Sequence, residues 1–402
     1  MPLRRKLTWV AILYFAEGFP FGIVIDNLPV YFRTHGVSLV DIGLMSLLGL
    51  PWTLKVAWAP LVDRLGHARR WIVTALASMA LLLAALPSCD PGRPGLALWT
   101  LLLAFTVASA TQDIAIDAYT IGFLARGEEG VANGVRVAAY RAALIVGGGG
   151  LVALAEYAGW RAVFTAAAGV LIVLALVISR TPVIAVETGP RQQWLASFLS
   201  WLRRPGAIFV FLFVLTYKLG DASMGPMVKP FWIDRGLTVK EVGLVSTTAG
   251  VALGVLGALA GGAFTSRFGI FRGLWMLGLA QAFSNLGYAA AAALGAGRAG
   301  IYAASVCESF TGGLGTAAFL AFLMRACDKR QAATQYALLS ALFGLTRTLA
   351  GAASGIATAR LGYASYFAFT FLLAFPAYLF LPWVRAWAGD MDEGERTRGV
   401  AT

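Results

Sequence analysis

The sequence predicts an all-α membrane protein with twelve transmembrane helices in two six-helix halves. The first observation behind this prediction is composition: 59% of the 402 residues are hydrophobic, only 13% are charged, and the mean hydropathy is +0.74. The second is that continuous apolar segments of about 20 residues recur along the chain, each long enough to span a hydrocarbon core. Continuous segments favour helices over the alternating strands of a barrel. The third is that the two halves of the chain share motifs.

The individual elements follow from the apolar segments and from the charges between them. Basic residues gather in alternate connections, which places that side of the membrane and both termini in the cytoplasm. The first apolar segment contains Glu17 and continues into the fold, so we expect a first span rather than a cleaved signal. The expected spans are residues 8–31, 39–61, 71–87, 96–124, 130–157, 161–180, 207–233, 239–265, 271–294, 299–325, 332–359 and 363–387.

Composition also excludes several classes of protein. A net charge of +12 is common in nucleic-acid-binding proteins, but here the basic residues lie in short connections rather than on one soluble face. The cysteines (Cys89, Cys307 and Cys327) are scattered, and both histidines fall in predicted loops. Neither a metal site nor a catalytic triad is therefore expected. We expect no enzyme, no nucleic-acid partner, no metal and no cofactor.

The internal repeat divides the chain into parts. The segment 36–46 matches 236–246 at an offset of 200 residues, and Gly159-Trp160 corresponds to Gly362-Tyr363. Between the halves, Trp194, Phe198 and Trp201 share one helical stripe, which predicts an amphipathic helix on the cytoplasmic membrane surface. The predicted parts are an N-terminal half (1–180), a cytoplasmic linker with this helix (181–206), a C-terminal half (207–388) and an acidic cytoplasmic tail (389–402).

Acidic residues at membrane depth are the first candidates for function. Asp113 and Asp117 are four residues apart, so a helix places both carboxylates on one face. A carboxylate in the bilayer normally faces a partner or a water-filled cavity, and such a group can carry a proton. These acids could also serve only to join helices through ion pairs. The predicted proton-coupling residues are Asp113, Glu17, Asp117 and Glu308.

Cations and polar side chains in the spans are the candidates for binding a solute that is anionic or zwitterionic. Lys55 could instead extend to the membrane surface, and Lys218 and Asp221 could neutralise each other. The uncharged polar residues could equally form helix–helix hydrogen bonds, and Asp26 and Lys229 are further charges at membrane depth. The predicted substrate-binding residues are Lys55, Arg141, Lys218, Asp221, Tyr14, Tyr119, Tyr140, Gln112, Gln281, Asn285, Gln335 and Arg347.

Several motifs resemble those of known transporters. The loop after the second span, Asp63-Arg64-Leu65-Gly66 followed by Arg69-Arg70, resembles the signature loop of the major facilitator superfamily, which implies a gating role for Asp63, Arg64, Gly66 and Arg70. Other motifs resemble the AmpG muropeptide permeases within that superfamily, in the same order, from about residue 9 to residue 385. These motifs are residues 50–55, 58–64, 112–119, 217–222, 308–316 and 333–341.

The resemblance implies a monomeric, proton-driven importer in the lipid bilayer of the bacterial inner membrane, with the proton gradient in place of a cofactor. Such permeases bring N-acetylglucosamine–anhydro-N-acetylmuramic acid, with or without peptide, from periplasm to cytoplasm. This traffic serves cell-wall recycling and feeds β-lactamase induction. The related group also contains importers of siderophores and acetyl-coenzyme A, which remain the alternative. The chain lacks two extra spans that some AmpG proteins carry.

Overall fold

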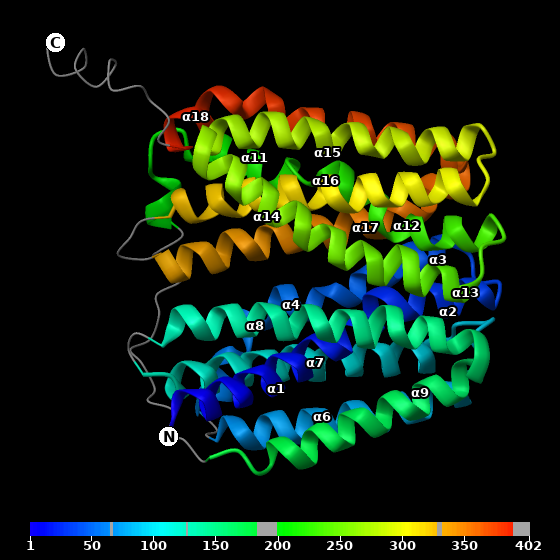
Figure 1. Cartoon of the computed structure of the whole chain (residues 1–402), viewed down its shortest axis with the longest axis vertical. Helices are drawn as coiled ribbons and strands as arrows, with labels where there is room; N and C mark the ends of the chain where they lie inside the picture. Colours follow the sequence, from blue (N-terminus) through cyan, green and yellow to red (C-terminus); the bar gives the residue numbers. More distant parts are fainter. Residues whose placement is uncertain (65–66, 126–127, 183–198, 328–331, 389–402) are drawn as a thin grey trace, which may run out of the picture. The chain divides into compact units, whose positions relative to one another are not determined.

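The computed structural model describes the chain except for residues 65–66, 126–127, 183–198, 328–331 and 389–402, and the described residues form helices and turns without a strand (Figure 1). By internal contacts the chain divides into two compact units. Unit 1 comprises Met1–Pro190 and Val228–Val251, and unit 2 comprises Arg191–Met227 and Ala252–Thr402. The division into sequence halves and a linker stays a prediction, because these units group residues by contact rather than by repeat.

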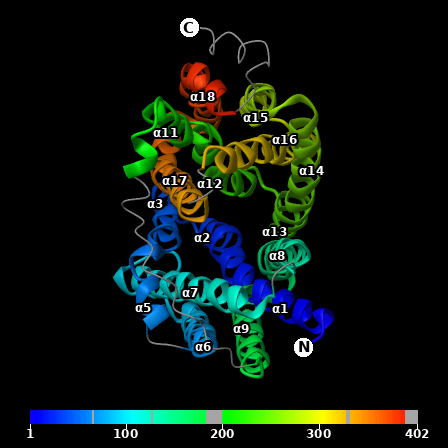
Figure 2. The ribbon, with the colours of Figure 1, turned by 90° about the vertical axis from the view of Figure 1, so that its left-hand side faces the viewer.

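Unit 1 is a bundle in which α1 packs on α7 and α8, and α6 packs on α7 and α9 (Figure 2). Its elements are α1 (Leu3–Gly22), η1 (Ile23–Asn27), α2 (Leu28–Thr34), α3 (Leu39–Leu44), η2 (Met45–Gly49), α4 (Leu50–Leu54), η3 (Lys55–Ala57), α5 (Ala59–Arg64), α6 (Ala68–Ala85), η4 (Leu86–Ser88), α7 (Leu96–Phe123), α8 (Glu129–Leu144), η5 (Ile145–Gly150), α9 (Leu151–Ile178), α13 (Val239–Glu241) and η6 (Val242–Ala249). Three of these, η1, η5 and η6, are π-helical.

Unit 2 is a second bundle, in which α15 packs on α16 and α17. Two helices, α12 and α14, pass from one unit into the other. The elements of this part of the chain are α11 (Ala207–Thr216), α12 (Leu219–Asp234), α14 (Gly250–Phe268), α15 (Ile270–Ala293), α16 (Arg298–Arg325), α17 (Ala332–Leu372), η7 (Phe375–Phe380) and α18 (Leu381–Ala388).

The helices account for the twelve predicted spans. In the described residues nine continuous helical stretches are long and apolar enough to cross a membrane. Two of them, Val131–Ile178 and Gln335–Ala388, are long enough for two crossings each, and each contains a glycine with non-helical backbone angles, Gly159 and Gly362. Helix α15, with 24 residues, supplies the remaining span. The prediction of an all-α membrane protein with twelve spans is confirmed.

Backbone geometry repeats where the sequence repeats. Gly36 and Gly236, 200 residues apart, have φ values of 79° and 74°, and Gly159 and Gly362 have 76° and 74°. These positive values favour glycine because a Cβ would be strained there. The next helix in each repeat begins with the same type of cap, in which a hydroxyl accepts from a backbone N–H three residues on (Ser38 from Asp41, Thr238 from Glu241).

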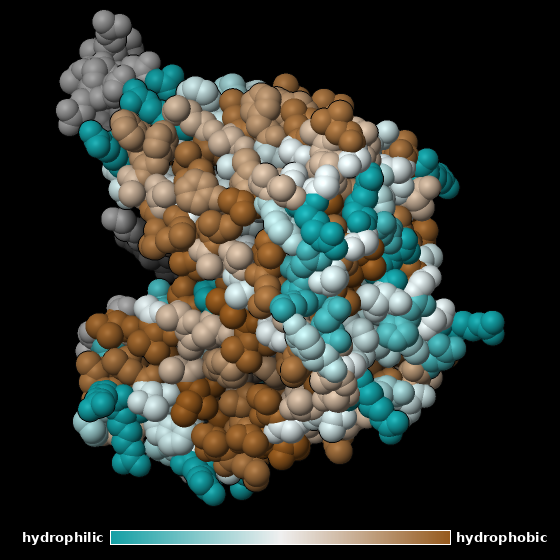
Figure 3. Space-filling view, turned by 45° about the vertical axis from the view of Figure 1, so that its right-hand side comes forward, coloured by the Kyte–Doolittle hydropathy of each residue, from teal (hydrophilic) through white to brown (hydrophobic). Residues whose placement is uncertain are grey.

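The surface has the polarity that a membrane requires. Figure 3 shows hydrophobic surface along the flanks of the helices and hydrophilic surface gathered toward helix ends and connections. Large apolar side chains such as Leu81, Leu259 and Leu379 are about 70% exposed. Lipid tails can cover these side chains in a membrane-spanning bundle.

The end of the predicted linker helix is placed differently from the prediction. Trp201 is 1% exposed and lies in the hydrophobic core of unit 2 rather than at the membrane surface. Its Nε1 donates to the carbonyl of Ala326 (3.1 Å) and its ring packs on Trp387. An indole in a core needs such an acceptor for its N–H. Trp194, Phe198 and the acidic tail lie outside the described residues.

Candidate functional site

The first of two charged clusters lies in unit 1, where α1 contacts both α7 and α8 (Figures 1 and 2). A glycine makes the contact with α8 close. A Cβ on Gly18 would lie 2.9 Å from the carbonyl oxygen of Tyr140 and 3.0 Å from the Cβ of Ala143. Small residues at such positions let membrane helices approach one another. The polar side chains of α1 next to Gly18 are thereby brought against α7 and α8.

The two carboxylates of α7 meet a lysine from the second span. Lys55 begins η3, a 3₁₀ segment that follows the short helix α4. Its Nζ donates to Oδ2 of Asp113 and lies 3.9 Å from Oδ2 of Asp117. The side chain therefore pairs inside unit 1, and the alternative that it extends to the membrane surface is not what the structure shows.

A second cation, Arg136 of α8, joins the cluster from the other side. Its Nη2 lies 3.3 Å from Oδ1 of Asp117, and its guanidinium carbon lies 4.4 Å from the ring centroid of Tyr14. The hydroxyl of Tyr14 donates to the same Asp117 oxygen (2.8 Å). Sequence reasoning missed Arg136 because an arginine near the start of a span is ordinary on the basic side of a membrane. The available signal was that Arg136 and Tyr140 are four residues apart, which places both on one face of a helix.

The third acid of the cluster is Glu17 of α1. Carboxylate oxygens of Glu17, Asp113 and Asp117 all lie within 4.8 Å of one another. Oxygen Oε2 of Glu17 is buried and has no hydrogen-bond partner in the described part of the chain. Carboxylates this close can share a proton or bind a small cation together. We call this set of Tyr14, Glu17, Lys55, Asp113, Asp117 and Arg136 the acid–cation cluster.

The second charged cluster lies in unit 2 around Lys218, in the break between α11 and α12. This residue is 2% exposed. Its Nζ donates to Oε1 of Gln281 (2.7 Å), Oγ1 of Thr316 (2.8 Å) and the carbonyl of Gly312 (3.4 Å). Asp221 Oδ2 is 3.7 Å away. Unit 2 itself thus supplies acceptors for all three N–H groups of the lysine.

Three of the predicted polar residues join segments of the chain instead of facing open space. Buried Gln112 donates to the carbonyl of Ala16 (3.0 Å). The hydroxyl of Tyr119 donates to the carbonyl of Pro182 (2.8 Å), and Asn285 donates to Oγ1 of Thr370 (3.2 Å). The contacts of Gln112 and Asn285 are helix–helix hydrogen bonds, as the alternative interpretation has it, whereas Pro182 lies beyond the end of α9.

Of the remaining predicted residues, Glu308 interacts electrostatically with Lys218 and so belongs to the surroundings of the second cluster. Arg141 and Arg347 are exposed, Gln335 is buried, and Glu308 lies one turn before Gly312 on α16. Among the described residues Arg141 makes no hydrogen bond or ion pair, and it lies five residues beyond Arg136 on α8. Of the predicted gating loop, Arg70 is exposed. Gly66 and the side chains of Asp63 and Arg64 lie outside what the structure describes.

Two further ion pairs in unit 1 connect α12 to the first span. Lys229 Nζ donates to Oδ1 of Asp26, and both side chains are largely buried. Arg33 and Asp234 form a bidentate pair with two distances of 2.6 Å. Sequence reasoning named Asp26 and Lys229 as charges at membrane depth but did not pair them.

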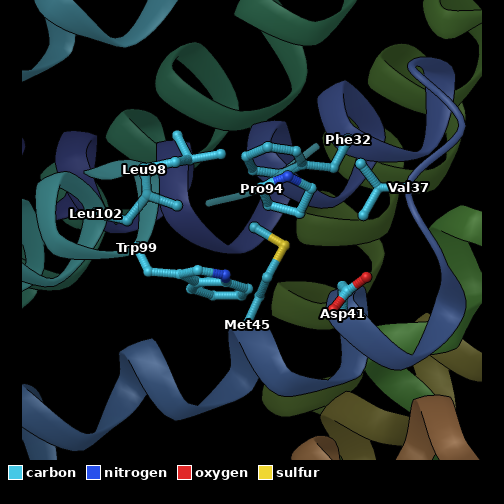
Figure 4. Close-up of a pocket in the computed structure, with 8 residues that line it drawn as sticks. All are labelled: Phe32, Val37, Asp41, Met45, Pro94, Leu98, Trp99 and Leu102. Atoms are coloured by element: carbon cyan, nitrogen blue, oxygen red, sulfur yellow. The ribbon is translucent and has the colours of Figure 1, made fainter. Parts of the chain in front are cut away.

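Unit 1 also has a small apolar pocket, which Figure 4 shows with its lining side chains. It lies at the start of α7, where Leu102 is eleven residues before Asp113. The pocket is therefore distinct from the acid–cation cluster. Its lining residues are Phe32, Val37, Asp41, Met45, Pro94, Leu98, Trp99 and Leu102.

Comparison with known sequences identifies relatives over nearly the whole chain. A family model described as Major Facilitator Superfamily matches residues 10–217. The anhydromuropeptide permease of Escherichia coli K12 is 33% identical over 384 residues, a match that covers 92% of this chain and 78% of that protein. A Rickettsia felis protein that carries the name AmpG 4 is 28% identical over 402 residues, covering 94% of this chain and 95% of that protein.

Comparison of structures agrees on the fold. The crystal structure of a bacterial homologue of the human lysosomal transporter Spinster superposes with a TM-score of 0.76. It covers 96% of this chain and 98% of that chain at 16% sequence identity. At this identity the likeness shows the fold alone.

Proposed function

This chain belongs to the AmpG-like permeases of the major facilitator superfamily, and from that premise we propose that it imports anhydromuropeptides together with protons. It is a multi-pass membrane transporter and not an enzyme. The proposed substrate is N-acetylglucosamine–anhydro-N-acetylmuramic acid, with or without peptide, and the proposed direction is from periplasm to cytoplasm. The proposed location is the lipid bilayer of the bacterial inner membrane, with both termini in the cytoplasm. We propose that the transporter works as a monomer and needs no cofactor beyond the proton gradient.

The observation that carries the proposal is the charge balance of the acid–cation cluster. Its three carboxylates, on α1 and α7, face two cations, on η3 and α8, so full ionisation leaves one excess negative charge. Among the described residues, Tyr14 is the remaining titratable group in contact with the cluster. An excess charge at membrane depth is costly, and one proton on a carboxylate removes it. An anionic solute entering this cluster adds a negative charge and favours that proton further, which is a physical basis for symport.

The substrate assignment is supported by chemistry as well as by the relatives. An anhydromuropeptide presents a lactyl or peptide carboxylate, which suits Lys55 and Arg136. Its amides and hydroxyls can bond to polar side chains, and its sugar faces suit aromatic ones. The alternative is another bulky anion, such as a siderophore or acetyl-coenzyme A.

The test is uptake of the radiolabelled anhydro-disaccharide into proteoliposomes, with and without an inward proton gradient. We expect uptake that requires the gradient and that is lost in Asp113→Asn. Glu156→Gln removes an exposed acid of unit 1 outside the cluster and serves as the matched control. Uptake that ignores the gradient, or an unchanged gradient dependence in both Asp113→Asn and Glu17→Gln, would contradict proton coupling through the cluster. If folded wild-type protein takes up none of the disaccharide, siderophores and acyl-coenzyme A compounds are screened next.

A further inference from the structure

The two cations of the acid–cation cluster differ from Lys218 in how much of their hydrogen-bonding capacity the protein uses. The side chain of Lys218 is 3% exposed and its donors are occupied. The side chain of Arg136 is 44% exposed. Among the described residues it donates no hydrogen bond of good geometry and makes one ion-pair contact, to Asp117. A guanidinium has five N–H donors, so most of those on Arg136 are open to a ligand.

Three aromatic rings lie one helical turn away from the charges on three separate segments. Phe21 is four residues after Glu17 on α1, Tyr140 is four residues after Arg136 on α8, and Trp52 is three residues before Lys55. Residues at these spacings share a helix face. The ring centroids of Phe21 and Trp52 are 5.1 Å apart, and those of Phe21 and Tyr140 are 6.2 Å apart. We call Phe21, Trp52 and Tyr140 the aromatic layer.

Arg136 and the aromatic layer together indicate which kind of molecule could bind. An arginine fork matches the geometry of a carboxylate and binds it through two parallel hydrogen bonds. Aromatic rings offer large, rigid apolar surface at little entropic cost, which suits the C–H face of a sugar ring. A solute that carries a carboxylate about one helical turn from a pyranose ring would contact both groups at once.

We propose that Arg136 binds the carboxylate of the transported sugar acid, in place of Asp117, while a pyranose ring packs on the aromatic layer. This proposal rests on the proposed function, since it names which residues recognise which part of the substrate. The stack of Arg136 on Tyr14 holds the guanidinium in position during the exchange of partners. Asp117 keeps its hydrogen bond from Tyr14 but loses its arginine, so binding of substrate and of a proton are linked at this carboxylate.

The test compares two forms of one substrate in proteoliposome uptake. The first is the anhydro-disaccharide with its free lactyl carboxylate, and the second is the same disaccharide with that group converted to a primary amide. We expect Arg136→Gln to raise KM for the acid by about 10- to 100-fold, because a charge-assisted bidentate contact is lost. KM for the amide should change by less than about threefold. Uptake of the amide by the variant also demonstrates that it is folded, and Arg136→Lys should lose part of the preference for the acid.

The same comparison separates the two arginines of α8. Arg141→Gln should leave the ratio of the acid and amide KM values as in the wild type, and so should Arg161→Gln, an exposed arginine of α9. A changed ratio in Arg141→Gln together with an unchanged ratio in Arg136→Gln would overturn the proposal. So would an equal effect of Arg136→Gln on acid and amide. If Arg136→Gln takes up neither form, the ratio of the acid and amide KM values is measured in Arg136→Lys instead, and a ratio equal to that of wild type would overturn the proposal.

The aromatic layer has its own signature. Trp52→Ala should raise KM for the acid and the amide by the same factor, because the sugar is common to both, whereas Trp52→Phe should retain most of the affinity. If Trp52→Ala leaves both KM values unchanged, the sugar does not pack there. Failure of the proposed function looks different, since the wild-type protein would then take up neither form of the disaccharide.

Discussion

The glycine run of η5 allows a sharp prediction about packing in unit 1. Gly149 and Gly150 are neighbours in the same π-helical segment, yet they differ in surroundings. A Cβ on Gly149 would collide with Oγ1 of Thr248 and would lie 2.5 Å from the carbonyl oxygen of Gly243 and 3.0 Å from the backbone N of Thr248. A Cβ on Gly150, which is exposed, would meet only the carbonyl oxygen of Ile145, at 3.4 Å. Neighbouring backbone atoms leave no room for a side chain at Gly149, whereas Gly150 has room for one.

The expected magnitudes follow from these distances. Gly149→Ala must move backbone of η6, and overpacking of this kind costs about 1–3 kcal/mol. Gly150→Ala meets no comparable obstacle and should gain the roughly 0.5–1 kcal/mol by which alanine is preferred to glycine in a helix. The two variants should therefore differ by about 1.5–4 kcal/mol in unfolding free energy. Gly243→Ala, whose Cβ would lie 2.5 Å from the carbonyl oxygen of Gly149, should behave like Gly149→Ala.

The assay is thermal unfolding of the purified variants in detergent micelles, followed by tryptophan fluorescence. We expect a lower Tm for Gly149→Ala and Gly243→Ala than for wild type, and an equal or higher Tm for Gly150→Ala. Equal Tm values for Gly149→Ala and Gly150→Ala would refute the reasoning, because they would mean that η5 and η6 do not touch at Gly149.

Three further predictions concern other parts of the chain. Lys218→Met should lower stability by about 1–3 kcal/mol, since Gln281 and Thr316 lose their donor, and a Tm equal to wild type would show that the lysine is not held as described. Gly362 has a φ of 74°, and neither Gly362 nor the helical Gly169 has a neighbour that a Cβ would meet. The unfolding free energy of Gly362→Ala should therefore be about 1 kcal/mol lower than that of Gly169→Ala, because only the first variant forces alanine into the left-handed region. Equal Tm values would argue against the positive φ. The hydrogen bond from Lys6 holds the pKa of Glu128 below its usual range. A carboxyl group whose pKa is lower in the folded than in the unfolded protein stabilises the fold at pH values above its unfolded pKa. The Tm of wild type should therefore exceed that of Glu128→Gln at neutral pH, and this difference should vanish as the pH falls through the folded-state pKa. A Tm difference that is constant with pH would exclude this linkage.

The sequence anticipated part of the acid–cation cluster and not the rest. The spacing of Asp113 and Asp117 placed both on one face, and Glu17 and Lys55 stood out because charges are rare in apolar spans. Arg136 did not stand out, because it lies close to a cytoplasmic span end where arginines are common. Arg141, deeper in the predicted span, looked more unusual, yet the structure leaves it exposed and unpaired among the described residues.

The same contrast applies to Lys218. Its spacing from Asp221 suggested mutual neutralisation, but the nearest acceptors come from α15 and α16. Gln281 and Thr316 lie 63 and 98 residues further along the chain, so no local pattern could have named them as partners. Uncharged acceptors also leave no sign of their role in a sequence, because glutamine and threonine are common in membrane helices.

By itself the sequence determined the twelve spans, the repeat and the list of charges at membrane depth. Each of these is a local property: the cost of placing a residue in hydrocarbon depends on that residue and its immediate neighbours, and a positive φ at Gly36 or Gly236 depends on one turn. Only the tertiary structure decided which charges meet. The pairing of Lys55 with Asp113, of Lys229 with Asp26 and of Arg136 with Asp117 depends on how far each helix is rotated and how closely it approaches its neighbours. That rotation results from packing between segments distant in sequence, such as α1 against α8 at Gly18, and no single segment encodes it.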